Sequence, residues 1–150
     1  DYGQLGQNNR IYRSSPTLVP APSGTQWRKV VGGYTAYYIA VRSDQTLWAW
    51  GRQTDNYGNL GQNQTNGSRS RPTQIGTGAD WKDCSSSAMM GSAIKTDGTL
   101  WSWGYNHQGQ LGHNDIVFKS SPTQVGTATN WVNTNNPLLG NLLATQPGTD

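Results

Sequence analysis

A short glycine-containing motif occurs three times in this chain, as YGQLG at residues 2–6, YGNLG at 57–61 and QGQLG at 108–112. The copies begin 55 and 51 residues apart. A second block, AVRSDQTLWAWG at residues 40–51, returns as AIKTDGTLWSWG at residues 93–104. Self-similarity with a period of about 50 residues indicates an array of equivalent structural units. Any fold assigned to this chain must therefore be a repeat architecture.

The tryptophans follow the same period, and all seven occupy equivalent places in the units. Such regular placement favours a packing role for the indole rings, because ligand-binding tryptophans have no reason to follow a repeat. We expect Trp50 and Trp103 to be buried at equivalent places in adjacent units. The three columns of tryptophans are Trp27, Trp81 and Trp131; Trp48 and Trp101; and Trp50 and Trp103. The corresponding units are approximately 1–51, 52–104 and 105–150, the last of them degenerate or incomplete.

The composition favours short strands over helices. Only 33% of the 150 residues are hydrophobic and 13% are charged, whereas 19 are glycine and 7 are proline. A core built from this chain must rely on large aromatic rings, and its strands must be joined by many turns. A helical solenoid is disfavoured, because no apolar pattern with a 3.6-residue period extends over ten residues before the C-terminal tail.

Each unit divides into four short extended segments. Asp97 and Gly98 lie between two β-compatible runs, which is typical of a tight hairpin turn, and Asp44 with Gln45 occupies the equivalent place. The prolines mark the fourth segment, since proline is tolerated at the start of a strand or on an edge strand. We expect one strand at the first tryptophan column, at residues 27–31 and 81–85, and two strands on either side of the Asp-Gly turn, at 93–96 and 100–104. The strand that follows the prolines is expected at 17–19, 73–75 and 123–125. Four strands in about 50 residues is the scale of a β-propeller blade.

The stretch TDGTLWSWGYNHQGQLG, residues 96–112, resembles the repeat of the regulator of chromosome condensation (RCC1) family. The L-W-x-W-G, G-Q-L-G, Pro-Thr and tryptophan landmarks recur in the family's order over nearly the whole chain. The family's members form seven-bladed β-propellers, so the resemblance implies an all-β fold with blades of four short antiparallel strands. The chain would supply about two and a half to three blades of a larger closed propeller. The remaining blades would come from the same or an associated chain.

An open array of blades exposes strand edges and aromatic faces, which promotes aggregation. We therefore expect isolated residues 1–150 to be unstable or to self-associate. The motif glycines are expected to form tight loops, because glycine accepts backbone conformations that other residues avoid. These structural glycines are Gly58, Gly61, Gly109 and Gly112.

No catalytic or metal-binding constellation is apparent in the sequence. There is no G-x-S-x-G or phosphate-binding G-x-x-x-x-G-K motif, and His107 and His113 have no cysteine or glutamate beside them. Asp44 and Asp97 are turn residues one blade apart rather than a carboxylate pair. The lone Cys84 is expected to be a buried, inert thiol. We expect a protein that is not an enzyme and that needs no cofactor or metal.

Three tyrosines and two arginines are the candidate partner-binding residues. Tyr34, Tyr37 and Tyr38 have no aromatic counterpart in the next unit, which is typical either of a binding face or of packing between blades. Arg69 and Arg71 form a small basic cluster. The other basic residues are scattered, so nucleic acid is not the expected partner, and no apolar run is long enough to span a membrane.

The sequence thus predicts a non-enzymatic scaffold that binds a protein or glycan partner. All eight acids are aspartates in a surface rich in amides and hydroxyls, which favours a secreted, cell-surface or virion component. The resemblance to the RCC1 family implies an alternative, a nucleotide-exchange factor for small GTPases or a chromatin-binding regulator, with a cytoplasmic or nuclear location. The family also includes secreted bacterial proteins that inhibit enzymes.

Overall fold

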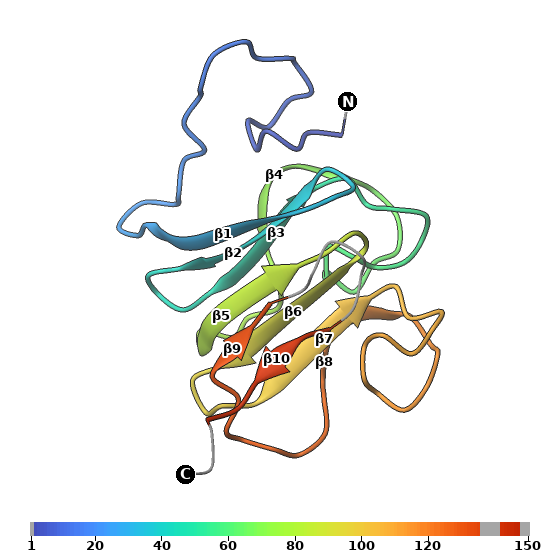
Figure 1. Ribbon diagram of the computed structural model, residues 1–150. Coiled ribbons are helices and arrows are strands. Elements are labelled where there is room, and N and C mark those ends of the chain that lie inside the picture. The colour runs from blue at the N-terminus through green and yellow to red at the C-terminus, as the bar shows by residue number, and fades with distance from the viewer. Residues whose placement is uncertain (1, 136–141, 148–150) are drawn as a thin grey trace.

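The computed structural model describes residues 2–135 and 142–147, and all regular structure within them is β (Figure 1). Two four-stranded antiparallel sheets have the strand orders β1-β2-β3-β4 and β5-β6-β7-β8, and a third sheet has two strands, β9 and β10. Each larger sheet is a blade in which every strand pairs with the next strand along the chain. The prediction of an all-β chain made from four-stranded blades is confirmed.

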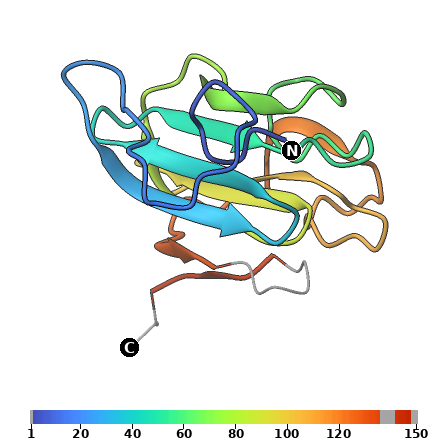
Figure 2. The ribbon, with the colours of Figure 1, turned by 90° about the horizontal axis from the view of Figure 1, so that it is seen from above.

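The strand boundaries repeat from one blade to the next. The first blade comprises β1 (Trp27–Gly33), β2 (Tyr37–Arg42), β3 (Leu47–Gly51) and β4 (Arg69–Gln74). The second comprises β5 (Trp81–Ser86), β6 (Met90–Lys95), β7 (Leu100–Gly104) and β8 (Lys119–Gln124). The third sheet pairs β9 (Asn133–Thr134) with β10 (Ala144–Thr145). Seen from above, the N-terminal segment lies over the first blade, and β9 and β10 lie to one side (Figure 2).

The predicted hairpin turns are present, and both are closed by the same polar chain. The Asp44 carboxylate accepts hydrogen bonds from the Thr46 amide at 3.2 Å and the Thr46 hydroxyl at 2.6 Å. The Thr46 hydroxyl oxygen accepts a bond from the Trp48 indole at 2.7 Å. The second hairpin repeats this chain from Asp97, with side-chain distances of 2.7 and 2.9 Å. These bonds lower the pKa values of both aspartates. The two carboxylates therefore serve to close the turns.

The core lies between the two blades, where β5 contacts both β1 and β2. Ile39, Val41 and Leu47 from the first blade are fully buried against residues of the second, including Trp103 and Cys84. Trp50 is 3% exposed and Trp103 0%, which confirms that they are buried at equivalent places. Burial raises the pKa of the Cys84 thiol to about 12, so this cysteine packs as a small apolar residue.

The three glycine motifs form loops, which we call the first (residues 2–6), second (57–61) and third (108–112) latch. The first packs on the first blade, and the second runs from the first blade onto the second. In the second latch the carbonyl of Asn59 accepts a bond from the Trp103 indole at 3.0 Å. In the first, the carbonyl of Gln4 accepts one from Trp50 at 3.1 Å. Gly58 has φ +74°, and a Cβ there would lie 2.5 Å from the Cα of Ser120. The predicted tight glycine loops are confirmed.

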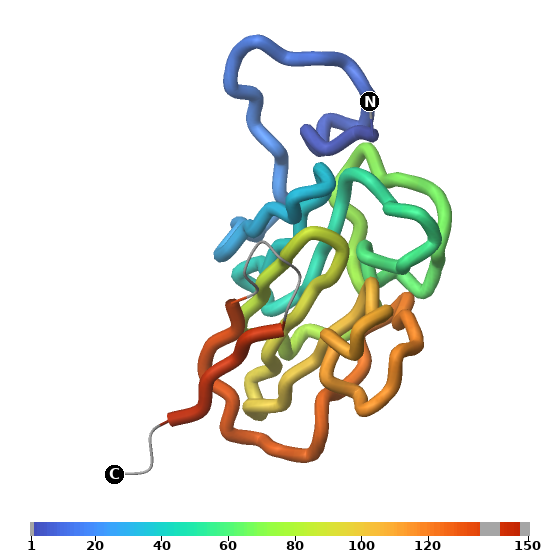
Figure 3. The backbone as a smooth tube through the Cα atoms, turned by 45° about the vertical axis from the view of Figure 1, so that its right-hand side comes forward, coloured from blue at the N-terminus to red at the C-terminus, as the bar shows by residue number. Residues whose placement is uncertain are grey.

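The fourth strand differs from the prediction. It begins four residues earlier than expected in both blades, at Arg69 and Lys119, because it pairs back to the glycine that ends the preceding strand. Proline is accommodated inside it because this strand is the sheet edge. The strand expected at residues 17–19 is wrong, since among the described residues no L-W-x-W-G strand lies beside it. This N-terminal segment forms a loop at one end of the array (Figure 3), and the Val19 carbonyl accepts a bond from the Trp27 indole of β1 at 3.0 Å.

The third unit is only partly described. Trp131 is half-buried, and its amide donates to the carbonyl of Gly98 at 3.1 Å, so it continues the first tryptophan column. Each four-stranded blade draws strands from two of the sequence units, because its outer strand lies beyond the latch. The unit at 105–150 includes residues 136–141 and 148–150, which lie outside the described residues.

Candidate protein-interaction face

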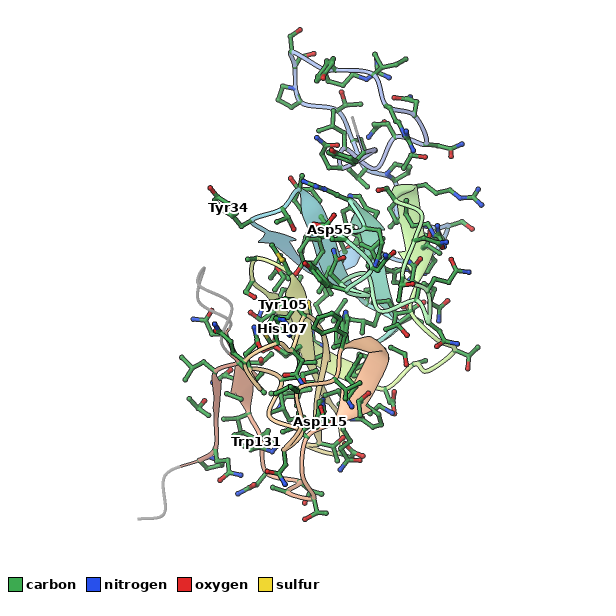
Figure 4. The ribbon with its side chains drawn as sticks, turned by 90° about the vertical axis from the view of Figure 1, so that its right-hand side faces the viewer. Tyr34, Asp55, Tyr105, His107, Asp115 and Trp131 are labelled. Atoms are coloured by element: carbon green, nitrogen blue, oxygen red, sulfur yellow. The ribbon has the colours of Figure 1, made fainter. Side chains whose placement is uncertain are left out.

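The connections that follow β1, β3, β5 and β7 emerge on one side of the array, because alternate strands run in the same direction. We call this side the loop face, and Figure 4 looks onto it. Its two long connections, residues 52–68 and 105–118, contain the second and third latches. The hairpin turns of Asp44 and Asp97 lie on the opposite side.

Four rings from the two long connections form a cluster on the loop face. We call Tyr57, Tyr105, His107 and Phe118 the aromatic cluster. The ring centroids of Tyr57 and Tyr105 are 4.8 Å apart, and those of Tyr57 and Phe118 are 5.1 Å apart, both edge to face. Tyr105 stacks on Phe118 at 5.4 Å, and His107 lies within 5.9 Å of both. Such edge-to-face and stacked pairs are favourable geometries for aromatic rings.

The loop that carries three of these rings is held by a buried asparagine. Asn106 is fully buried, and its amide nitrogen donates to the carbonyls of Asp115 at 2.9 Å and Val117 at 3.1 Å. Its side-chain oxygen accepts a bond from the Leu111 amide at 2.9 Å. The Lys119 ammonium lies 2.8 Å from the Asp115 carboxylate, and this contact lowers the pKa of that carboxyl. The cluster is therefore presented on a loop of defined shape.

The tyrosines singled out from the sequence lie in three different environments. Tyr34, on the β1–β2 hairpin, is 79% exposed on the loop face, away from the aromatic cluster (Figure 4). Tyr38 is half-buried and stacks on Trp50 with centroids 5.5 Å apart. Tyr37 is 0% exposed, and its hydroxyl donates to carbonyls of the next blade. Tyr37 is thus a packing residue between blades, which corrects its prediction as a partner contact.

The two arginines also differ. The Arg69 guanidinium is used within its own loop, donating to the side chains of Gln62 and Gln64 and to the Gly67 carbonyl. Arg71 is exposed. Arg69 therefore orders the connection 52–68, and Arg71 is the one of the pair that a partner could reach.

One serine and one histidine lie in contact near the third latch. The Ser102 hydroxyl lies 2.9 Å from His113 Nε2, but Ser102 is fully buried and donates to the Leu111 carbonyl at 2.7 Å. Burial is the main cause that lowers the pKa of His113. Within residues 2–135 and 142–147, no group of three His, Cys, Asp or Glu could hold a metal ion, and no helix is long and apolar enough to cross a membrane.

Comparison with known proteins identifies the repeat. The family model of the regulator of chromosome condensation (RCC1) repeat matches residues 97–133. The ultraviolet-B receptor UVR8 of Arabidopsis thaliana is 28% identical over 123 residues, 81% of this chain and 27% of UVR8. The E3 ubiquitin-protein ligase HERC2 of Homo sapiens is 31% identical over 119 residues, 75% of this chain and 2% of HERC2. The crystal structure of Prp20p from Saccharomyces cerevisiae matches with a TM-score of 0.78 and 16% identity, covering 95% of this chain and 36% of that chain.

The chain contains an RCC1-like repeat at residues 97–133. The match at residues 97–133 runs from the Asp97 turn through β7, the third latch and β8, which are the elements that define the blade. At 16% identity the likeness to Prp20p concerns the fold alone. The chain spans 27% of UVR8 and 2% of HERC2. The activities of those two proteins are therefore not assigned to this chain.

Sequence reasoning missed the aromatic cluster of this RCC1-like array. Its signal was present: Tyr57 is the first residue of the second latch, and Tyr105 directly follows the L-W-x-W-G strand. The equivalent residues one blade earlier, Tyr2 and Arg52, also contact each other, with the guanidinium 4.7 Å from the ring centroid. Pairing the first latch residue with the residue after W-G would have predicted both contacts.

Proposed function

We propose that this chain forms part of a non-catalytic RCC1-like scaffold that binds a partner protein through its loop face. The observation that carries the proposal is the aromatic cluster, four rings presented at the surface on a loop held by Asn106. Partially exposed aromatic side chains on an ordered support are typical of the residues that dominate protein interfaces. Because the loop is already ordered, its binding costs less conformational entropy.

Aliphatic residues beside the cluster extend its apolar surface. Ile116 and Val117 are 63% and 60% exposed in the same connection as Tyr105. The rings are turned toward one another, so the cluster offers ring edges and aliphatic side chains rather than one flat platform. This shape suits the apolar side chains of a protein better than the ring of a sugar, and we therefore propose a protein partner rather than a glycan.

A non-catalytic role is supported by the state of the candidate reactive groups. The Cys84 thiol and the Ser102 hydroxyl are fully buried, so neither can reach a substrate. The aspartates of the hairpins are engaged in turns one blade apart. A location outside the cell or on a virion stays a prediction from composition.

Photo-crosslinking from the loop face tests the proposal. A photoreactive amino acid at His107 should capture the partner in extracts of the source organism, whereas one at exposed Ser43, on the hairpin side, should not. Replacing Tyr105 by alanine in the His107-labelled protein should reduce the captured band at least tenfold. Equal capture from both positions, or capture unaffected by Tyr105→Ala, would contradict a loop-face interface.

A second candidate function is nucleotide exchange on a small GTPase or binding to histones. The observation that favours it is the fold likeness to Prp20p, whose structure was reported with its binding properties to Gsp1p and histones. An exchange assay separates the two candidates. Release of a fluorescent guanine nucleotide from a small GTPase, accelerated by this chain and lost in Tyr105→Ala, would favour the second. An unchanged release rate together with His107-specific crosslinking would favour the first.

A further inference from the structure

The connection between the two blades is short and contains two glycines. Residues 75–80 join β4 to β5 and are two residues fewer than the equivalent segment 19–26 that precedes β1. Gly76 and Gly78 have no side chains to fill the space beside this connection. A groove of about 530 Å³ lies there, between the outer strand of the first blade and the second blade. Its walls lie within residues 61–122, so two complete blades form it.

A buried indole nitrogen beside this groove has no hydrogen-bond partner. Trp81 lines the groove and is 5% exposed, and its Nε1 meets no acceptor within the described part of the chain. In the first blade, the equivalent Trp27 donates to the Val19 carbonyl at 3.0 Å. A Cβ at Gly78 would lie 3.5 Å from the Trp81 nitrogen, so no side chain covers it on that side. Because an unpaired buried donor is unfavourable, a ligand oxygen that accepts this bond would be stabilised here.

The aromatic wall of the groove is held in one orientation. Trp101 is half-buried, and its indole nitrogen donates to the Thr99 hydroxyl at 2.9 Å. The Lys95 ammonium lies 4.5 Å from the centroid of the Trp101 ring and 3.2 Å from the Asp80 carboxylate. The nitrogen of this indole is thus already used, so Trp101 offers a ligand the apolar surface of its ring.

The two cations that line the groove do not require an anionic ligand. Lys95 is paired with Asp80, and the Arg69 guanidinium donates to two glutamines and a carbonyl of its own loop. The wall also contains the Gln74 amide and the Ser121 hydroxyl, and each of these groups has both a donor and an acceptor. Sugar hydroxyls match them because a hydroxyl also donates and accepts. A proline-rich peptide offers mainly carbonyl acceptors, because proline has no N–H.

We propose that this groove binds a neutral saccharide, with one sugar ring against Trp101. Sugar hydroxyls bond to Gln74 and Ser121, and a sugar oxygen accepts the bond from Trp81 Nε1. The volume agrees with this ligand, since small-molecule sites occupy about 300–1,000 Å³ and combine apolar walls with a few convergent polar groups. The groove shares no residue with the aromatic cluster, so its ligand does not depend on the partner proposed for the loop face.

An array of neutral oligosaccharides of hexoses and N-acetylhexosamines, probed with the whole chain, tests the proposal. We expect saturable binding of at least one of these sugars, and no binding of polygalacturonate or of a polyproline peptide. Gln74→Ala should weaken sugar binding roughly tenfold, about the effect of one lost hydrogen bond. The matched control is Gln124→Ala, at the equivalent position of the second blade, which does not line the groove and should leave binding unchanged.

Filling the groove supplies a second, independent variant. Gly78→Leu should abolish sugar binding, whereas Thr77→Leu, at the adjacent exposed position that does not line the groove, should preserve it. Ala128 occupies the place of Gly78 in the next unit, so this position of the repeat accepts a side chain.

The indole N–H signals in an NMR spectrum report directly on the unpaired donor. Addition of the bound sugar should shift the Trp81 signal and leave the Trp27 signal in place. Three results would overturn the proposal: no binding of any neutral sugar, stronger binding of polygalacturonate or polyproline, or sugar binding that Gly78→Leu does not reduce. A Trp81 signal that stays unchanged at saturation would also contradict the position proposed for the sugar.

Discussion

At the scale of single residues, equivalent positions in the repeat have different surroundings, and the surroundings decide each residue's role. Gly58 and Gly109 both have φ +74° and the same place in their latches. A Cβ at Gly58 would collide with the backbone of β8, whereas one at Gly109 would meet only a carbonyl oxygen at 3.8 Å. Substituting each of the two glycines in turn can therefore separate the effect of backbone conformation on stability from the effect of packing.

Gly58→Ala should destabilise the chain more than Gly109→Ala. Both substitutions strain a left-handed backbone, which costs about 1–2 kcal/mol. Only Gly58→Ala also forces the second latch away from β8, for which overpacking adds about 1–3 kcal/mol. Chemical denaturation of the two variants measures the difference. Equal losses would mean that the latch does not press on the next blade.

His113 should make stability depend on pH near neutrality. Burial lowers its pKa in the folded chain below the ordinary 6.5. As the pH falls through that value, the unfolded chain takes up a proton before the folded chain does, so stability decreases. His113→Gln should remove this decrease, since Gln62 fills the equivalent place in the first blade and donates to the Thr73 carbonyl at 3.2 Å. Thermal unfolding between pH 7.5 and 5 tests this, with His107→Gln as the control.

At the scale of elements, the hairpin is the unit that repeats most faithfully. Its turn aspartate, threonine and tryptophan form the same chain of hydrogen bonds in both blades. Each hydroxyl donates to the carboxylate and accepts from the indole, so the threonine links the turn to the strand that follows. The tight turn and the orientation of the tryptophan are consequently coupled.

Thr99→Val should weaken the second hairpin. Valine keeps the shape of the buried Thr99 side chain but removes the acceptor for the Trp101 indole and a donor to Asp97. We expect a loss of about 1 kcal/mol in the free energy of unfolding, as for a typical hydrogen bond. Thr96→Val, at an exposed position in the same turn, is the control and should stay within about 0.5 kcal/mol of the parent.

These elements also explain which parts of the fold the sequence could predict. The hairpins follow from local rules, because the Asp-Gly turn and the alternation of Trp101 and Trp103 lie within a few residues. The strand at 17–19 could not be judged locally, since a strand exists only where a partner lies beside it. Tyr37 and Tyr38 are adjacent, yet one is buried and one half-buried, because alternate residues of β2 point to opposite faces of the sheet and only Tyr37 faces the second blade. The aromatic cluster joins residues of two loops, so no single segment contained it.

At the scale of the whole molecule, the blades are joined by polar contacts as well as by the apolar core. The Lys29 ammonium of the first blade lies 2.6 Å from the Asp83 carboxylate of the second. The other carboxylate oxygen of Asp83 accepts a bond from the Thr134 amide of β9 at 3.4 Å. The Tyr37 hydroxyl lies 3.1 Å from the Ser87 carbonyl oxygen and 2.7 Å from that of Met90. Through Asp83, β5 thus contacts β1 on one side and β9 on the other.

Tyr37→Phe should loosen the junction between the blades. The substitution removes the hydroxyl donor from the Ser87 and Met90 carbonyls, of which Met90 keeps the bond from the Ser87 amide at 3.0 Å. We expect a cost of about 1–2 kcal/mol. Tyr38→Phe changes a hydroxyl on the adjacent, half-buried ring and should have an effect below about 0.5 kcal/mol. Hydrogen exchange of the β5 and β6 amides reports directly on the junction. Unchanged exchange in Tyr37→Phe would show that the apolar core alone holds the blades together.

The latches give the array a direction. The second latch extends from the first blade to the second, so the surface offered at one end of this pair differs from the surface offered at the other. Contacts of this heterologous kind propagate from head to tail, and they end in a closed ring only if the rotation between neighbours completes a full turn. Two copies of this chain therefore have no reason to meet through a two-fold axis at these ends. Any self-association through them would produce rings or open filaments whose length depends on concentration.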